Sequence, residues 1–137
     1  MVLFFCPQVQ TLKGGKWYYA EYTMFSVESE ANNYIIHLAG YVGNGGDSLT
    51  NTSVDPLYWN HNGMAFSTYD VDNDRRTHAS CASIYSSGWW FNNCYCTCLT
   101  CIYSSNDFCW YTLNDSPYNE QGGLLRAARM MIRRNYP

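Results

Sequence analysis

Aromatic and apolar residues alternate with polar ones in the first half of the chain. The pattern is clearest in Trp17–Tyr22, Phe25–Val27 and Tyr34–Leu38. A period of two places successive side chains on opposite faces of a strand, and aromatic and β-branched residues favour strands. Turn residues interrupt the pattern at Glu28–Asn33 and at the glycine-rich Gly43–Asp47. We therefore predict at least three strands in this part of the chain.

The second half of the chain loses this period. Residues 51–63 are rich in Asn, Ser, Pro and Gly, which predicts a surface loop. Beyond Phe66, Asp, Asn, Ser, Gly and Cys dominate until the tail. An irregular segment of this length is uncommon unless ligands, metal or disulfides hold it.

The tail, Leu124–Arg134, has two interpretations. Its propensities weakly favour a short helix with Arg126, Arg129 and Arg133 on one face. The alternative is a closing strand centred on Met130–Ile132. Propensity alone leads us to expect the helix.

Composition is typical of one folded domain spanning residues 1–137. The chain is 47% hydrophobic and 14% charged, too apolar for intrinsic disorder. Its net charge of -3 argues against a general nucleic-acid binder, which needs a basic surface to displace counterions. No apolar run approaches the ~20 residues of a membrane span, so we expect none.

Seven cysteines indicate an oxidising compartment or a metal site, and six of them lie between Cys81 and Cys109. The odd number leaves at least one thiol without an internal disulfide partner. The triplets Asn51-Thr52-Ser53 and Asn114-Asp115-Ser116 are acceptors for N-glycosylation, which also favours an extracellular protein.

One CxxC pair, Cys98–Cys101, occurs in the cysteine-rich segment. Two such pairs would indicate zinc, but only one is present. Disulfides are therefore favoured, with a thiolate metal site on Cys96, Cys98, Cys101 and Cys109 as the alternative. The sequence alone does not determine the pairing of the remaining cysteines, which are Cys6, Cys96, Cys98, Cys101 and Cys109.

Asp70–Asp74 places three carboxylates at alternate positions. A compact loop can turn such a set toward Ca²⁺, with backbone carbonyls completing the shell. It is not an EF-hand, because Arg75 stands where that loop needs Gly and Cys81 where it needs Glu. A solvated acidic turn without metal is the alternative.

The sequence lacks the nucleophile-elbow, P-loop and HExxH motifs, and we therefore predict that the protein is not an enzyme. Gly88–Phe91 contains three bulky aromatic residues close to Cys94. Such a group forms either a buried plug over a disulfide or the floor of a ligand pocket.

Taken together, these segments resemble the fibrinogen C-terminal domain family, which includes ficolins, tachylectins, angiopoietins and tenascin tips. The resemblance runs from about Trp17 to Arg133. The segments that carry it are Tyr19–Tyr22, Phe25–Val27, Asn33–Tyr34, Gly43–Leu49, His61–Thr68, Asp70–Asp74, Cys81–Ala82, Tyr85, Gly88–Phe91, Cys94 and Met130–Arg133.

The resemblance implies an α+β fold with an antiparallel sheet and a loop-rich subdomain that holds calcium and the ligand. The family's N-terminal third has no counterpart here, so we expect a fold that is incomplete at the N-terminus. Met1–Leu12 stands in its place without a match. Sheet edges left exposed would favour association, and family members oligomerise through a segment not present in this chain.

The resemblance also implies site residues. Calcium would be bound by Asp72 and Asp74 and by carbonyls of Arg76 and His78. A disulfide would join Cys81 to Cys94, following a cis Asn93–Cys94 peptide. An acetyl-binding pocket would then be formed by Tyr85, Trp90, Asn93, Cys94, Tyr95 and Tyr103.

Two departures from the family bear on that pocket. Tyr95 replaces the usual His, and the usual Asn-Leu-Asn-Gly stretch is replaced by Tyr95–Cys101. The leading hypothesis is a secreted, lectin-like module for acetylated glycans in innate immune recognition. The alternative is a fibrinogen-like module that binds an extracellular protein and has no working sugar pocket.

Overall fold

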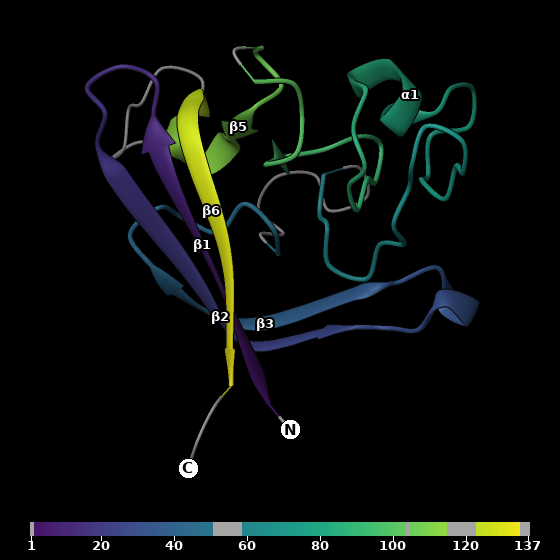
Figure 1. Ribbon diagram of the computed structural model, residues 1–137, viewed down its shortest axis with the longest axis horizontal. Coiled ribbons are helices and arrows are strands. Elements are labelled where there is room, and N and C mark those ends of the chain that lie inside the picture. Colours follow the sequence, from purple (N-terminus) through teal and green to yellow (C-terminus); the bar gives the residue numbers. More distant parts are fainter. Residues whose placement is uncertain (1, 51–58, 104, 115–122, 135–137) are drawn as a thin grey trace.

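The computed structural model describes residues 2–50, 59–103, 105–114 and 123–134. A four-stranded antiparallel sheet, in the order β3-β2-β1-β6, lies beside a part made mostly of loops (Figure 1). This agrees with the α+β class expected from the sequence. The elements are β1 Leu3–Thr11, β2 Trp17–Val27, the 3-10 helix η1 Glu30–Asn32, β3 Ile36–Gly43, α1 Cys81–Tyr85, β4 Thr97–Cys98, β5 Cys109–Trp110, the 3-10 helix η2 Tyr111–Asn114 and β6 Leu125–Arg134.

β1 comes from the N-terminal segment for which the sequence predicted no structure. It lies between β2 and β6 and pairs with both (Figure 1). Phe5, Pro7, Val9 and Thr11 are buried, and the residues that alternate with them are partly exposed. Gly14 and Gly15, both at positive φ, form the turn to β2, since glycine adopts this conformation at no steric cost. β1 thus joins β2 and β6 into one sheet.

β2 is one continuous strand, so the expectation of three strands between Trp17 and Leu49 is wrong by one. Phe25–Val27 belongs to β2, and β3 is the second strand. Both strands bend toward the loop-rich part (Figure 1). Gly40, at φ 72°, faces Thr23 near this bend, where a Cβ would lie 2.0 Å from Thr23 Oγ1. The close approach of the two strands requires glycine at this position.

The tail forms strand β6, and the helix expected from propensity is wrong. β6 pairs with β1 along its length, from Leu3 opposite Arg134 to Thr11 opposite Leu125. Isolated helices of this length are only marginally stable, so pairing with β1 overrides the weak propensity.

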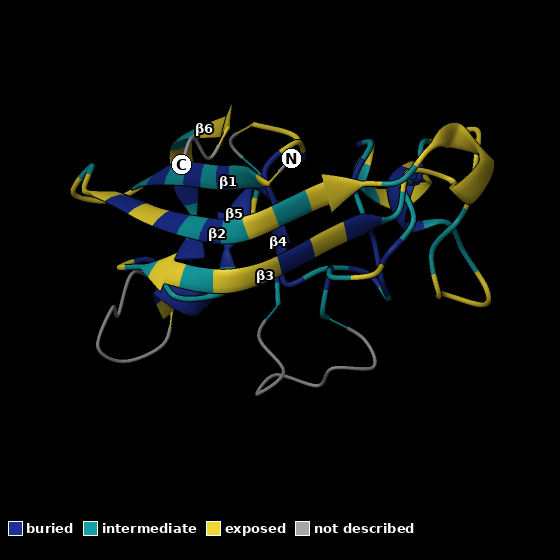
Figure 2. Ribbon diagram, turned by 90° about the horizontal axis from the view of Figure 1, so that it is seen from below, coloured by how far each residue is buried: buried dark blue, intermediate teal, exposed yellow. Residues whose placement is uncertain are grey.

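The core lies between the sheet and the loops, since buried residues of β1, β2 and β3 (dark blue in Figure 2) belong to one hydrophobic cluster with buried residues of the loop-rich part. Trp110 is fully buried, and its Nε1 donates to the carbonyls of Gly45 and Gly46 at 3.1 and 3.0 Å. Thr112 Oγ1 donates to the Gly45 carbonyl at 2.7 Å. The glycine-rich turn after β3 is therefore attached to the cysteine-rich end of the chain.

The predicted loop 51–63 lies largely outside the described residues, as do Asn51-Thr52-Ser53 and part of the second glycosylation triplet. Within the described residues, no helix is both long enough and apolar enough to span a membrane.

Replacing Gly40 with alanine is expected to destabilise the fold by roughly 2–4 kcal/mol, because the new methyl group adds a clash with Thr23 to the strain of a positive φ. Gly14→Ala is the matched control, since Gly14 has a φ of 77° and no atom within 4 Å of the added Cβ. Urea unfolding monitored by tryptophan fluorescence would measure both. Equal losses for the two variants would contradict the proposed contact, whereas partial recovery by adding Thr23→Ala would support it.

Candidate functional site

The loop-rich part is organised around His61, which is 1% exposed. Its Nδ1 lies 2.9 Å from the Trp90 carbonyl oxygen, and its Nε2 lies 3.1 and 3.2 Å from the backbone nitrogens of Cys96 and Thr97. A carbonyl can only accept and an amide N–H can only donate, so the ring is neutral with its proton on Nδ1. Burial lowers the pKa of His61 to about 4, which agrees with the neutral form. His61 therefore joins the segment that precedes Cys94 to the segment that follows it.

The Cys81–Cys94 disulfide is formed, with a Cα–Cα distance of 5.6 Å. The Asn93–Cys94 peptide is cis, as the family resemblance implies. Arg76 Nη1 lies 3.6 Å from Cys94 Sγ. This disulfide anchors the first residue of α1 to the predicted pocket.

Tyr85 and Tyr95, which the resemblance assigned to one pocket, lie in contact with each other in the structure. Their rings meet edge to face with centroids 4.8 Å apart, and Phe91 packs 6.3 Å from each. The Tyr95 hydroxyl donates to Asp107 Oδ1 at 2.5 Å. Burial and this carboxylate raise the pKa of Tyr95, so the phenol stays protonated. Asp107 was not predicted, because nothing in the local sequence marks it as the partner of Tyr95.

The other predicted pocket residues lie in different surroundings. Trp90 packs against Phe66 at 5.1 Å and donates from Nε1 to the Tyr34 carbonyl at 2.9 Å. Tyr103 is 66% exposed and lies 6.0 Å from Phe108. Trp90 therefore faces a groove beside the sheet, while Asn93 is half-buried next to Cys94.

The acidic segment forms a loop closed by its own carboxylates. Asp74 Oδ1 accepts from Arg76 N and its Oδ2 from Cys81 N, both at 2.7 Å. Asp72 Oδ1 accepts from Asp74 N at 3.2 Å. Burial raises the pKa of Asp74, and the neighbouring Asp72 carboxylate raises it further, against the lowering effect of the two N–H donors.

Whether this loop suits calcium depends on its donors. Asp72 and Asp74 supply carboxylate oxygens, and the carbonyls of Arg76 and His78 could add neutral oxygens, a set that Ca²⁺ accepts. Among the described residues, no group of three or more His, Cys, Asp or Glu side chains converges on one point. Asp70 accepts from Thr68 Oγ1 at 2.7 Å instead. The donor chemistry therefore fits calcium, but backbone oxygens or water must complete the shell.

The cysteine-rich segment forms a second disulfide, Cys98–Cys101, with a Cα–Cα distance of 5.4 Å. This contradicts the alternative of a four-thiolate zinc site, since two of its sulfurs are bonded to each other. Cys109 lies opposite Cys98 in the β4–β5 pair. Burial raises the pKa of the Cys109 thiol to about 12, so it is protonated at neutral pH.

A surface with exposed apolar side chains lies next to the acidic loop. We call it the Tyr69 surface and define it by Tyr69, Val71 and Ile84, which are 79%, 49% and 47% exposed. Ser83 Oγ donates to the Tyr69 carbonyl at 3.1 Å, so α1 and the loop lie side by side. A cavity of about 410 Å³ opens here, lined by Thr68, Tyr69, Asp70, Ser83, Ser86, Ser87 and Gly88.

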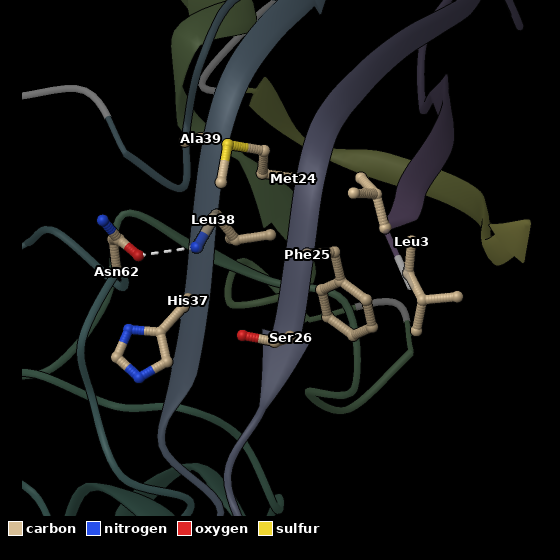
Figure 3. Close-up of a pocket in the computed structure, with 9 residues that line it drawn as sticks. Leu3, Met24, Phe25, Ser26, His37, Leu38, Ala39 and Asn62 are labelled. Atoms are coloured by element: carbon tan, nitrogen blue, oxygen red, sulfur yellow. Dashed lines mark hydrogen bonds between the residues drawn. The ribbon is translucent and has the colours of Figure 1, made fainter. Parts of the chain in front are cut away.

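A smaller cavity of about 260 Å³ lies between β2, β3 and the start of β1 (Figure 3). Leu3, Met24 and Phe25 form much of its apolar wall. Asn62 Oδ1 accepts from Leu38 N at 2.8 Å at its edge, shown as the dashed line in Figure 3. Asn62 directly follows His61, so this bond fixes the histidine segment to β3.

Comparison with known proteins gives a consistent set of similarities. The family model for the C-terminal globular domain of fibrinogen beta and gamma chains matches residues 8–133. The human fibrinogen alpha chain is 40% identical over 128 residues, covering 84% of this chain and 14% of that protein.

Solved structures of fibrinogen-like domains show the same fold. The fibrinogen-like globe domain of human ANGPTL6 matches with a TM-score of 0.78 and 28% identity, covering 99% of this chain and 58% of that one. A lamprey fibrin D-dimer complexed with the peptide Gly-His-Arg-Pro-amide matches with a TM-score of 0.72, covering 96% of this chain and 45% of that one. At 24% identity, this second likeness shows the fold alone. The chain thus spans only part of each of these relatives.

The neutral His61 predicts a loss of stability in acid. Its folded pKa lies below the ordinary value of 6.5, so the unfolded chain binds the extra proton more readily. The stabilisation is complete above about pH 6.5 and is lost as the pH falls toward 4, which amounts to roughly 2 kcal/mol at pH 5. Urea unfolding at pH 7 and pH 5 would measure the difference.

His61→Gln is the control, because glutamine can donate and accept without titrating. The variant is expected to be less stable at pH 7 but to lose much less stability on going to pH 5. The same pH-dependent loss in both proteins would show that His61 is not its source.

Proposed function

The chain belongs to the fibrinogen C-terminal globular domain family, and from that membership we propose that it is a secreted recognition module that binds an extracellular protein. The role is binding and not catalysis. The relatives that support this proposal are a fibrinogen chain and a fibrinogen-like globe domain. They support a protein ligand over a glycan.

The observation that carries the proposal is the Tyr69 surface. Aromatic side chains are enriched in the centres of protein interfaces, and exposed apolar groups rimmed by polar ones mark binding sites. Tyr69 and Ile84 are exposed beside a cavity whose rim carries the hydroxyl groups of Ser83 and Ser86. A protein partner could place an apolar side chain in this cavity and hydrogen-bond to its rim.

A second candidate function is binding of an acetylated group at Tyr85, Cys94 and Tyr95. The cis Asn93–Cys94 peptide and the edge-to-face tyrosine pair favour it. Two features weigh against it. Trp90 packs elsewhere, and the Tyr95 hydroxyl is already engaged by Asp107.

Calcium forms part of the proposal. Asp72 and Asp74 would hold the ion with the carbonyls of Arg76 and His78, next to the loop that carries Tyr69. A bound cation would supply positive charge between two carboxylates that otherwise repel each other. The protein's own contribution is to hold Asp74 in place through the N–H groups of Arg76 and Cys81.

Capture from a pool of extracellular proteins would test the site. Immobilised protein is expected to retain partners equally from untreated and enzymatically deglycosylated pools, and Tyr69→Ser/Ile84→Ser is expected to reduce capture about tenfold or more, since interface aromatics often contribute over 1.4 kcal/mol. Tyr19→Ser is the control, because Tyr19 is exposed on the sheet. Capture that disappears on deglycosylation, or that is eluted by N-acetylglucosamine, would replace the proposal with the acetyl-binding function.

Calcium binding predicts a rise in thermal stability. With free Ca²⁺ at a hundred times its Kd, the folded state should gain about 2.7 kcal/mol, visible as a higher Tm in differential scanning calorimetry. Asp72→Asn and Asp74→Asn should abolish the gain. Asp70→Asn should retain it, because Asp70 bonds to Thr68. A Tm that does not respond to calcium or to EGTA would remove the ion from the proposal.

A further inference from the structure

The Cys98–Cys101 disulfide joins a buried strand to a turn at the surface. Cys98 belongs to β4 and is 0% exposed. Cys101 follows in the turn, where its neighbours Thr100 and Ile102 are both exposed. A nucleophile from solvent therefore has no access to the Cys98 sulfur. Only a thiol inside the protein can attack the disulfide at that end.

Cys109 is placed to be that thiol. It belongs to neither disulfide and lies directly opposite Cys98 in the β4–β5 pair. Residues opposite each other in an antiparallel pair share one face, with Cα atoms about 4.5–5.5 Å apart, and disulfides span about 4.4–6.8 Å. The Cys98 backbone N–H also hydrogen-bonds to the Cys109 sulfur. Cys98 thus has two cysteines within bonding reach, Cys101 and Cys109.

We propose that Cys98, Cys101 and Cys109 form a disulfide-exchange site that presents Cys101 as a thiol for coupling to an external disulfide. Cys109 loses its proton to solvent, and its thiolate attacks the Cys98 sulfur. The bond between Cys98 and Cys101 breaks as the new bond forms, and Cys101 leaves as a thiolate that is protonated by solvent. One disulfide replaces another, so no oxidant or reductant is consumed. The Cys101 thiolate then attacks the disulfide of another molecule, which forms a mixed disulfide and releases one thiolate.

The surroundings of Cys109 control the rate of this exchange. Burial raises the pKa of Cys109 to about 12, the Cys98 N–H opposes this rise, and the Asp107 carboxylate adds to it. Asp107 also accepts from the Tyr95 hydroxyl, so these are the two titratable groups that the structure places against the thiol. Because the thiolate is the attacking form, exchange is slow at neutral pH and accelerates as the pH rises. A protected thiol is thereby replaced by one in a surface turn.

Iodoacetamide labelling of the folded protein, followed by peptide mapping in a mass spectrometer, would test the exchange. Label on Cys101 is expected to appear together with a Cys98–Cys109 disulfide, at a rate that rises about tenfold per pH unit between pH 7 and pH 9. Cys109→Ser should slow the labelling of Cys101 roughly tenfold or more, since the attacking thiol is lost. Cys96→Ser is the matched control, because Cys96 lies two positions before Cys98, and it should leave the rate unchanged. Circular dichroism would verify that each variant is folded.

Two labelling results would overturn the proposal. If Cys101 is labelled equally fast in Cys109→Ser, the disulfide is opened without Cys109. If the label is found on Cys109 while the Cys98–Cys101 bond stays intact, the thiol reacts without exchange. Loss of exchange in Cys96→Ser but not in Cys109→Ser would assign the attack to the wrong thiol.

Cys101→Ser provides an independent test that needs no exchange. Refolding this variant with oxidised glutathione is expected to give a Cys98–Cys109 disulfide, and glutathione on Cys98 in its place would show that Cys109 is out of reach. Oxidised glutathione also tests the coupling step in the unaltered protein. At about pH 8 it should modify Cys101, because thiolate attack on its disulfide leaves one glutathione attached. Modification of Cys109 instead would contradict the role assigned to Cys101.

Discussion

The arrangement of the loop-rich part depends on the need to satisfy backbone polar groups where there is little regular structure. Buried N–H and C=O groups require partners, and between Phe66 and Phe108 short elements supply few of them. The neutral ring of His61 binds one carbonyl and two N–H groups from segments on either side of Cys94. A charged imidazole could not do this, because both of its nitrogens would donate. The neutral state of His61 is therefore needed to hold together the two segments on either side of Cys94.

The same segment connects the loops to the sheet. Asn62 accepts from β3, and the backbone of Gly63 donates to the Ile36 carbonyl at 2.8 Å. At the other end, Trp110 holds the turn that follows β3. The sheet is thus a rigid support, and the acidic loop and the tyrosine pair are positioned by contacts that lead back to β3. Binding residues on loops held by a scaffold are common in recognition proteins.

The Tyr69 surface offers exposed aromatic and aliphatic side chains beside acidic residues. Its electrostatics are therefore set by Asp70, Asp72 and Asp74 and by any ion they hold.

The sequence by itself determined the family and the antiparallel sheet, and the family resemblance implied the Cys81–Cys94 pairing and assigned Tyr85 and Tyr95 to one pocket. Each rests on an ordered series of motifs. It did not reveal β1, because Pro7 lacks an N–H and proline seldom lies in a central strand. It also failed for the tail, since only pairing with β1 makes Leu125–Arg134 a strand. The roles of His61, Asp107 and Trp90 were decided by the tertiary structure alone, because their partners are 12 to 56 positions away in sequence and no local pattern encodes which buried groups will meet.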